Sequence, residues 1–195
     1  MKVKSKLHSE QLNRIKQSRD HIHQITDGGK MEIFQALKST LSDRQIIDII
    51  YDTLEKVMST SLNELHIIYP DDELNKELID LAELLYSGDN KTLEDRVKYW
   101  TSQHLTREVL FAYLCRIIDT EAFHILNGVI QRKIDKGYVE IVGSDGCECE
   151  QDGPCSEYVG EIFKISSMTK DMWPPYHPLC ECSILFWEEE DIEEE

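Results

Sequence analysis

The stretch Trp173-Pro-Pro-Tyr-His-Pro-Leu-Cys-Glu-Cys182 decides how the C-terminal part of this 195-residue chain is expected to fold. It holds a histidine and two cysteines in a loop that prolines stiffen, because each proline fixes φ near about −65°. A second group, Cys147, Cys149 and Cys155, lies just upstream. Two close-spaced groups of nitrogen and sulfur ligands on separate segments are typical of a metal knuckle.

Structural zinc takes about four such ligands in a tetrahedron, and its binding deprotonates the thiols and adds to folding energy. The candidate ligands are Cys147, Cys149, Cys155, His177, Cys180 and Cys182. We expect a structural Zn²⁺ site, although the spacing is irregular and does not say which four residues bind. Two alternatives stay open: thiols in a module that packs without metal, and disulfides formed in an assembled extracellular particle.

Size and composition indicate one soluble domain, or one domain with an appendage, at 22.7 kDa and 41% hydrophobic residues. No apolar run approaches the roughly 18 residues of a membrane span, so we expect no membrane partner. The N-terminus starts basic but lacks an apolar segment behind it, so a secretory signal is not expected. A reducing cytoplasm, the expected compartment during folding, favours metal binding over disulfides for clustered cysteines.

Charge is unevenly distributed within a net charge of −17. Residues 1–30 carry seven Lys or Arg against three acids, whereas the last eight residues, 188–195, carry seven acids. This balance argues against broad nucleic-acid binding, which needs a cationic face. Only the basic N-terminal segment is expected to contact phosphate, and a solvated helix face is its plainer interpretation. The acidic tail is expected to be disordered and solubilising, or to contact a basic partner.

Apolar residues at helical spacing predict helices through most of residues 1–136. A first helix, from about residue 7 to 25, is expected to stop at Asp27-Gly28-Gly29, and a second spans residues 31–41. The capping box Ser42–Gln45 is expected to begin a third helix, and the chain is expected to start a new helix at Ser61. Thr92 begins a helix that reaches His104.

The longest helix is expected from Thr106 to Lys136, followed by strands at residues 138–142, 161–165 and 183–187. The predicted fold class is therefore α+β, mainly α: a multi-helix body followed by a small three-stranded β module with the Cys/His cluster. We divide the chain into a helical N-terminal region (residues 1–105), the long helix with its β module (106–187) and the acidic tail (188–195).

Enzymatic activity is not expected, and neither is a small-molecule substrate. The chain has no His-Glu-x-x-His motif, phosphate-binding glycine loop or Gly-x-Ser-x-Gly elbow, and Pro154-Cys155 lacks the second cysteine of zinc deaminases. A Cys155–His177 pair is conceivable for cysteine-protease chemistry, but crowded cysteines suit ligation better. Cys115 lies on an apolar helix as an expected core thiol, and Glu121 and His124 are expected to share a local hydrogen bond.

The stretch from about Asp119 to Trp187 resembles the phage Mu F-like family of head morphogenesis (minor capsid) proteins. The resemblance rests on Thr120-Glu121, Asn127-Gly128, the segment Lys133 to Gly137, Cys155 five residues before Gly160, and the ending Pro174 to Cys182. The chain departs from the family pattern at three places. Asp119 and Glu181 stand where the family has arginine, and the first cysteine pair is stretched.

The resemblance implies a minor head protein of a phage or prophage that assists capsid assembly, portal association or DNA delivery. Its partners would be portal and capsid proteins, together with packaged DNA through the basic N-terminal segment. It would lie inside the procapsid and virion after assembly in the host cytoplasm. The two reversed charges put any phosphate or portal contact of those arginines in doubt. The alternatives are a zinc-stabilised interaction module outside a virion and, less favoured, a metal-dependent hydrolase or toxin-like domain.

Overall fold

The computed structural model describes residues 2–3, 5–39, 42–64, 92–134, 136–143, 153–174, 176–177 and 179–193. The helices of these segments are α1 (Ser5–Lys38), α2 (Asp43–Glu64), α4 (Leu93–Ser102) and α5 (Arg107–Lys133). The strands are β1 (Lys2–Val3), β2 (Tyr138–Val142), β3 (Ile162–Lys164), β4 (Ser183–Trp187) and β5 (Ile192–Glu193). Short 3₁₀ turns lie at Ile165–Ser167, Lys170–Met172 and Glu189–Asp191. The predicted fold class, a mainly helical body followed by a small three-stranded sheet, is confirmed.

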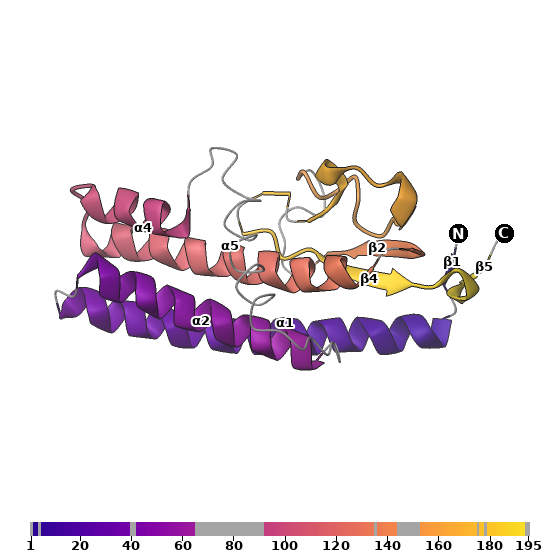
Figure 1. The fold of residues 1–195 in the computed structure, drawn as a ribbon, viewed down its shortest axis with the longest axis horizontal. Coiled ribbons are helices and arrows are strands. Elements are labelled where there is room, and N and C mark those ends of the chain that lie inside the picture. Colours follow the sequence, from indigo (N-terminus) through magenta and orange to yellow (C-terminus); the bar gives the residue numbers. More distant parts are fainter. Residues whose placement is uncertain are drawn as a thin grey trace.

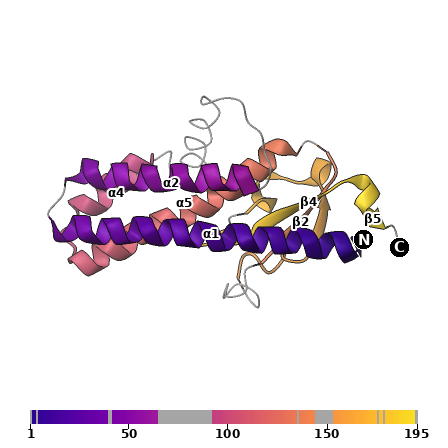
Figure 2. The ribbon, with the colours of Figure 1, turned by 90° about the horizontal axis from the view of Figure 1, so that it is seen from below.

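The helices form two layers (Figure 1). Helices α1 and α2 run antiparallel as one layer, and α5 packs against both with α4 beside its first half. Seen from below, α1 continues beyond the end of α2 and lies along the β strands (Figure 2). Helix α1 therefore contacts both the helical body and the C-terminal module.

Helix α1 is one continuous helix of 34 residues, so the predicted stop at Asp27-Gly28-Gly29 is wrong. Its buried positions, among them Ile15, Ile22 and Ile33, recur at helical spacing straight through the two glycines. Gly29 is there for close packing: a Cβ on it would lie 2.2 Å from Thr53 Oγ1 of α2. Packing against α2 thus outweighs the low helix propensity of glycine.

The two adjacent glycines provide a matched test of this close approach. Gly29→Ala should lower the free energy of unfolding by about 1–3 kcal/mol, because the added methyl group overpacks against Thr53. Gly28→Ala should raise it by about 0.5–1 kcal/mol, because nothing lies within 4 Å of that Cβ and alanine favours the helix. Urea unfolding of both variants tests this, and equal effects would contradict it.

Capping residues in the sequence predicted the starts of α2, α4 and α5 correctly. Ser42 N donates to Gln45 Oε1 at 3.0 Å, which confirms the capping box before α2. Helix α2 runs through Ser61 without a break, because the Ser61 hydroxyl donates to Val57 O instead of capping a new helix. Thr92 and Thr106 cap α4 and α5 as predicted, and α5 ends at Lys133, three residues before the expected end.

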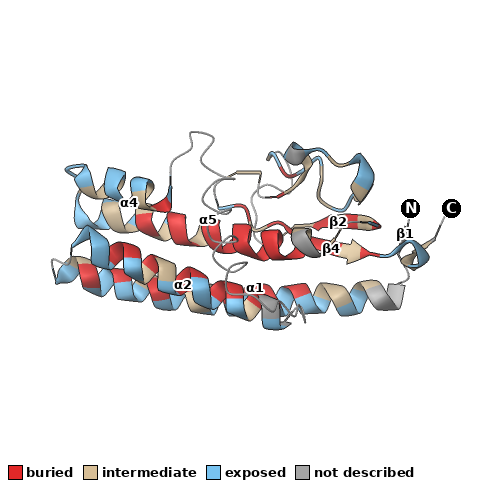
Figure 3. Cartoon of the chain, in the orientation of Figure 1, coloured by how far each residue is buried: buried red, intermediate tan, exposed pale blue. Residues whose placement is uncertain are grey.

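Helix α5 is the centre of the fold. Every residue from 120 to 130 is buried, as the continuous red stretch in Figure 3 shows. Helices α1 and α2 cover one side of it, and strand β4 packs on another. The helix was expected to carry an apolar stripe, but it also buries Thr120, Glu121, His124 and Asn127. These polar side chains must find partners inside the protein.

The three-stranded sheet is antiparallel with strand order β3-β2-β4, and β2 begins shortly after α5 ends. The central strand pairs Ile141 with Ile184 of β4. Gly137 begins the turn into the sheet with φ of +95°, and a Cβ there would lie 2.5 Å from Trp187 O. Buried side chains of this sheet and of the helices form one hydrophobic cluster that runs from Ile15 to Trp187.

The two ends of the sequence lie together (Figure 1). Strand β1 pairs antiparallel with β5, which sets Lys2 opposite Glu193 and Val3 opposite Ile192. The prediction of a disordered acidic tail is therefore wrong for Glu189–Glu193, which form a 3₁₀ turn and a short strand. Composition alone could not show that a complementary basic segment lies beside the tail.

Within the described part of the chain, no helix has an apolar stretch long enough to cross a bilayer.

Candidate metal centre

Three of the predicted ligands meet at one point of the C-terminal module. His177 Nε2 lies 3.1 Å from Cys155 Sγ, and Cys155 Sγ lies 3.7 Å from Cys180 Sγ. All three ligand atoms fall within 4.8 Å of one another. Both sulfur atoms belong to fully buried residues, and His177 is partly exposed. The sequence separation of 22 residues between Cys155 and His177 means that two distinct segments build the cluster.

The spacing of these atoms fits a tetrahedral ion. Zn–S bonds of about 2.3 Å and Zn–N bonds of about 2.0–2.1 Å place two ligating sulfurs about 3.8 Å apart, and sulfur and nitrogen about 3.6 Å apart. The observed sulfur–sulfur distance of 3.7 Å matches the first value. The His177–Cys155 distance of 3.1 Å is somewhat shorter than the second. The cluster can therefore hold a metal ion.

Cys182 supplies a fourth candidate ligand beside the other three. Its buried thiol interacts with both Cys180 and Cys155. The hydrogen bond from Cys182 lowers the pKa of the Cys180 thiol, while the same interaction and burial raise the pKa of Cys182. The Cys180 thiol is thus easier to ionise than its neighbour Cys182. A bound cation would displace thiol protons and allow the other thiols of the cluster to ionise.

Helix α5 holds the backbone of the ligand loop in place. Thr120 Oγ1 accepts a hydrogen bond from Leu179 N at 3.2 Å, and Asn127 Nδ2 donates to Cys182 O at 2.8 Å. Leu179 has φ of +62°, a left-handed conformation that non-glycine residues rarely adopt. The hydrogen bond from Leu179 N to Thr120 helps to maintain this conformation between His177 and Cys180. Thr120 and Asn127 are both buried, so the loop is held from the interior side by α5.

The segment that carries Cys155 is fixed to the sheet. Gly160, with φ of +83°, donates its N–H to Ile141 O at 2.8 Å, and Ile141 N donates to Glu161 O. The ring of Tyr158 stacks on that of Tyr176, with centroids 4.8 Å apart, and so joins this segment to the loop before His177. Both ligand segments are therefore positioned by contacts that do not depend on an ion.

Arg19 of α1 ties the helical body to the module. Its guanidinium donates to Val142 O at 2.7 Å, Gly143 O at 2.8 Å and Ser183 Oγ at 3.1 Å. Arg19 is buried, so the interpretation of the basic segment as a solvated helix face is wrong at this position. Sequence gives no signal for this contact, because an arginine on an amphipathic helix ordinarily faces water.

Two carboxylates, Asp119 and Glu181, both face α1. Lys30 Nζ lies 2.6 Å from Asp119 Oδ1, and His23 Nε2 lies 3.5 Å from Glu181 Oε2. Lys30 thus compensates the charge of Asp119, and His23 compensates that of Glu181 when its imidazole is protonated. Since Glu181 stands between Cys180 and Cys182, the His23 contact also reaches the ligand loop.

The His23–Glu181 contact should make stability depend weakly on pH. The hydrogen bond between His23 and Glu181 raises the pKa of His23, although burial opposes the shift. The stabilisation should be complete below about pH 6.5 and lost as pH rises through the raised pKa of the folded state. Because both side chains are partly exposed, we expect only about 0.3–0.5 kcal/mol. Unfolding of His23→Gln and the parent protein at acidic and alkaline pH measures the difference, and a pH-independent gap would contradict it.

A buried ion pair lies between α4 and α5. Arg96 Nη1 donates to Glu121 Oε1 at 2.7 Å, and Glu121 is fully buried. His124 Nδ1 lies 3.4 Å from Glu121 Oε2, close to the predicted local contact but beyond good hydrogen-bond geometry. The Nε and Nη2 atoms of Arg96 have no acceptor within the described segments. Sequence spacing indicated the Glu121–His124 pair, but only the fold reveals Arg96.

The other cysteines fall outside the cluster. Cys147 and Cys149 lie outside the described residues, so their predicted role as ligands stays a prediction. Cys115 is half-buried on α5, so the prediction of a core thiol is wrong, although burial raises its pKa to about 11. The four cysteines that the structure describes are free thiols, so the disulfide alternative finds no support among them.

Comparisons with protein-family models, with curated proteins and with solved structures found no match to this chain.

Proposed function

We propose that Cys155, His177, Cys180 and Cys182 form a structural zinc site that holds the small β module together. The convergence of three ligand atoms from two segments within 4.8 Å carries this proposal. Zinc suits a mixed set of thiolates and one imidazole, whereas magnesium and calcium prefer oxygen. The module gains from such an ion because three short strands bury little apolar surface by themselves.

A structural role suits the site better than a Cys–His catalytic pair. His177 lies within hydrogen-bond distance of Cys155, as a base would beside a nucleophile. A nucleophile must meet its substrate, however, and Cys155 is fully buried with Cys180 and Cys182 around it. Crowded, buried sulfurs favour ligation.

Metal content tests this proposal directly. Protein purified without chelator should contain one zinc per chain by elemental analysis. Titration of the same sample with a thiol reagent should show that three cysteines become reactive only after the zinc is removed. A metal-free protein with the same thiol reactivity before and after chelation would contradict the site.

We further propose that the chain is an assembly protein of a phage or prophage head that binds portal and capsid proteins inside the procapsid. The support for this role is the resemblance to the Mu F-like family, together with the contacts that the residues carrying this resemblance make. Thr120 and Asn127 hold the backbone of the His177–Cys182 loop, and Gly137 and Gly160 adopt positive φ. The residues that carry the resemblance are thus the ones that build the module.

Co-purification tests the assembly role. Tagged protein expressed in a lysate that is assembling heads should bring down the portal protein and enter procapsids. The Cys180→Ser variant should do neither if the module is the docking part, while Cys115→Ser should behave as the parent protein. Failure of the zinc-loaded parent protein to associate with portal or procapsid would contradict this role without affecting the zinc site.

A further inference from the structure

Cys155 and Cys180 are close enough for a second kind of chemistry besides metal binding. Their Sγ atoms lie 3.7 Å apart, although the two residues have a sequence separation of 25. A disulfide bond is about 2.05 Å long, so the two sulfurs would have to approach each other by less than about 2 Å. Both residues are free thiols in this structure. The pair that can hold an ion is thus also within reach of direct bond formation.

Contacts that involve no ion hold this pair together. On one segment, Tyr158 N donates to Cys155 O at 2.9 Å. On the other segment, Cys180 N donates to His177 O at 3.1 Å. The stacked rings of Tyr158 and Tyr176 join the two segments. Loss of an ion would therefore leave the two sulfurs beside each other instead of separating them.

The third thiol, Cys182, is less free to move toward a partner. Cys182 directly precedes β4, and its carbonyl accepts a hydrogen bond from Asn127 Nδ2 of α5 at 2.8 Å. The backbone of Cys182 is thus held by the sheet and by the central helix. Cys180 lies in the turn that follows His177, two residues further from the strand. A small movement of this turn is enough to bring Cys180 to Cys155.

We propose that Cys155 and Cys180 form a disulfide when the ion is lost and a peroxide is present, so that a covalent bond replaces the ion as the link between the two ligand segments. This proposal rests on the proposed zinc site for the ion that is replaced. The disulfide itself rests only on the position of the two thiols.

Hydrogen peroxide supplies the oxidising equivalents for this reaction in two steps. The Cys155 sulfur attacks one peroxide oxygen, the O–O bond breaks, and the other oxygen leaves as water with the thiol proton. The Cys180 sulfur then attacks the sulfenic sulfur of Cys155, and the S–O bond breaks. The hydroxyl group leaves as a second water with the proton of Cys180. One peroxide is thus reduced to two waters while two thiols are oxidised to one disulfide.

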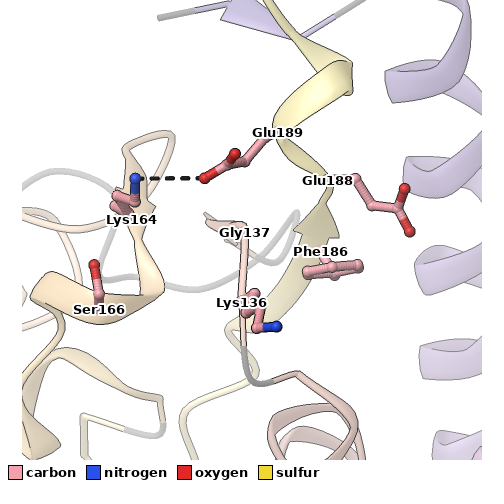
Figure 4. A pocket seen from close by; sticks show the side chains of 7 residues that line it. All are labelled: Lys136, Gly137, Lys164, Ser166, Phe186, Glu188 and Glu189. Atoms are coloured by element: carbon pink, nitrogen blue, oxygen red, sulfur yellow. Dashed lines mark ion pairs between the residues drawn. The ribbon is translucent and has the colours of Figure 1, made fainter.

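Burial of the sulfurs restricts the oxidant to a small molecule. Cys155 and Cys180 expose no surface, and His177 is the partly exposed residue beside them. Figure 4 shows the pocket of about 430 Å³ between the sheet and the acidic tail, whose described lining includes Lys136 and Glu189 but no residue of the metal centre. Entry beside His177 is therefore the route that the described surface offers. A bound ion would protect the thiols, because it occupies the sulfur electron pairs that attack the peroxide.

The test counts thiols in the full chain with C147S and C149S, which keeps four of the six cysteines. Chelated and zinc-loaded samples are treated with hydrogen peroxide, and free thiols are titrated after denaturation. The chelated sample should lose two of its four thiols, and trypsin digestion should link the peptide of Cys155 to that of Cys180. The zinc-loaded sample should keep all four over the same time. Loss of no thiol from the chelated sample, or equal losses from both samples, would overturn the proposal.

Two further serine variants of the same background identify the pair. Cys182→Ser should still lose two thiols, whereas Cys180→Ser should lose none. The reverse result would assign the bond to Cys155 and Cys182 and overturn the pairing proposed. Glutathione disulfide should oxidise the pair far more slowly than hydrogen peroxide because of its size, and equal rates would overturn the assignment to a peroxide.

A structural readout tests whether the disulfide replaces the ion. The chelated chain should keep its helical circular dichroism, and its oxidised form should unfold at a urea concentration about 1–2 M higher than its reduced form. Reduction with dithiothreitol should restore zinc uptake. Loss of the fold on chelation, or equal midpoints of the two forms, would overturn the replacement. A sample that forms the disulfide but never takes up zinc would contradict the zinc site while supporting the thiol pair.

Discussion

Cys180→Ser should abolish metal binding and lower the free energy of unfolding by about 4 kcal/mol. A ligand that binds only the folded state stabilises it by about 4.1 kcal/mol when its free concentration is 1,000 times its Kd. Serine is a poor zinc ligand, so this linkage is lost with the thiolate. Urea unfolding followed by the fluorescence of Trp173 and Trp187, which belong to the module, measures the loss.

Three controls separate the metal from the packing of a buried residue. The chelated parent protein should unfold at nearly the same urea concentration as Cys180→Ser, because both lack the ion. Cys115→Ser should keep its zinc, since that thiol lies on α5 away from the cluster. Retention of zinc in a Cys147→Ser/Cys149→Ser variant would assign the fourth position to Cys182. An unchanged unfolding curve after chelation would refute a stabilising ion.

Removal of one partner of the Arg96–Glu121 pair should have an effect of similar size. Glu121→Ala leaves the Arg96 guanidinium largely buried without its carboxylate, and such a loss costs about 3–5 kcal/mol. Arg96→Met should cost a comparable amount, because it leaves the Glu121 carboxylate fully buried and unpaired. Thermal and urea unfolding of the two single variants give these values.

The double variant Arg96→Met/Glu121→Leu tests whether the ion pair stabilises the fold more than an apolar pair of similar volume would. Replacement of a buried pair by apolar side chains of similar volume is often neutral, or stabilising by about 1–4 kcal/mol. We expect the double variant to unfold close to the parent protein. A loss equal to the sum of the two single losses would mean that Arg96 and Glu121 act independently, in conflict with the 2.7 Å contact.

Sequence predicted the elements that local chemistry determines. The capping residues Ser42, Thr92 and Thr106 mark helix starts, because each satisfies N–H groups of its own first turn. Alternating β-branched residues predicted β2, and an apolar and aromatic run predicted β4, both with the observed bounds. Strand β3 is two residues shorter than predicted. None of these features needs information from a distant part of the chain.

Errors arose where a distant contact overrode a local preference. Gly29 is a helix breaker by propensity, but contact with Thr53 makes it an interior helix residue. The acidic tail is disorder-prone by composition, but β1 pairs with it. In the site, ligand types and spacing indicated six candidates, of which the structure brings Cys155, His177 and Cys180 together. The role of Arg19 is recognisable only from the carbonyls that it meets.

The position of Arg19 also bears on how the chain would respond to mechanical load. Its guanidinium donates three hydrogen bonds, to the end of β2 and to the start of β4. The β4 partner, Ser183, directly follows Cys182. Tension applied along α1 would therefore reach the ligand loop through the Arg19 guanidinium and through the weaker His23–Glu181 contact. An ion that joins Cys155 to Cys180 would keep the two ligand segments together under that load, so the module would be pulled from the bundle as one unit.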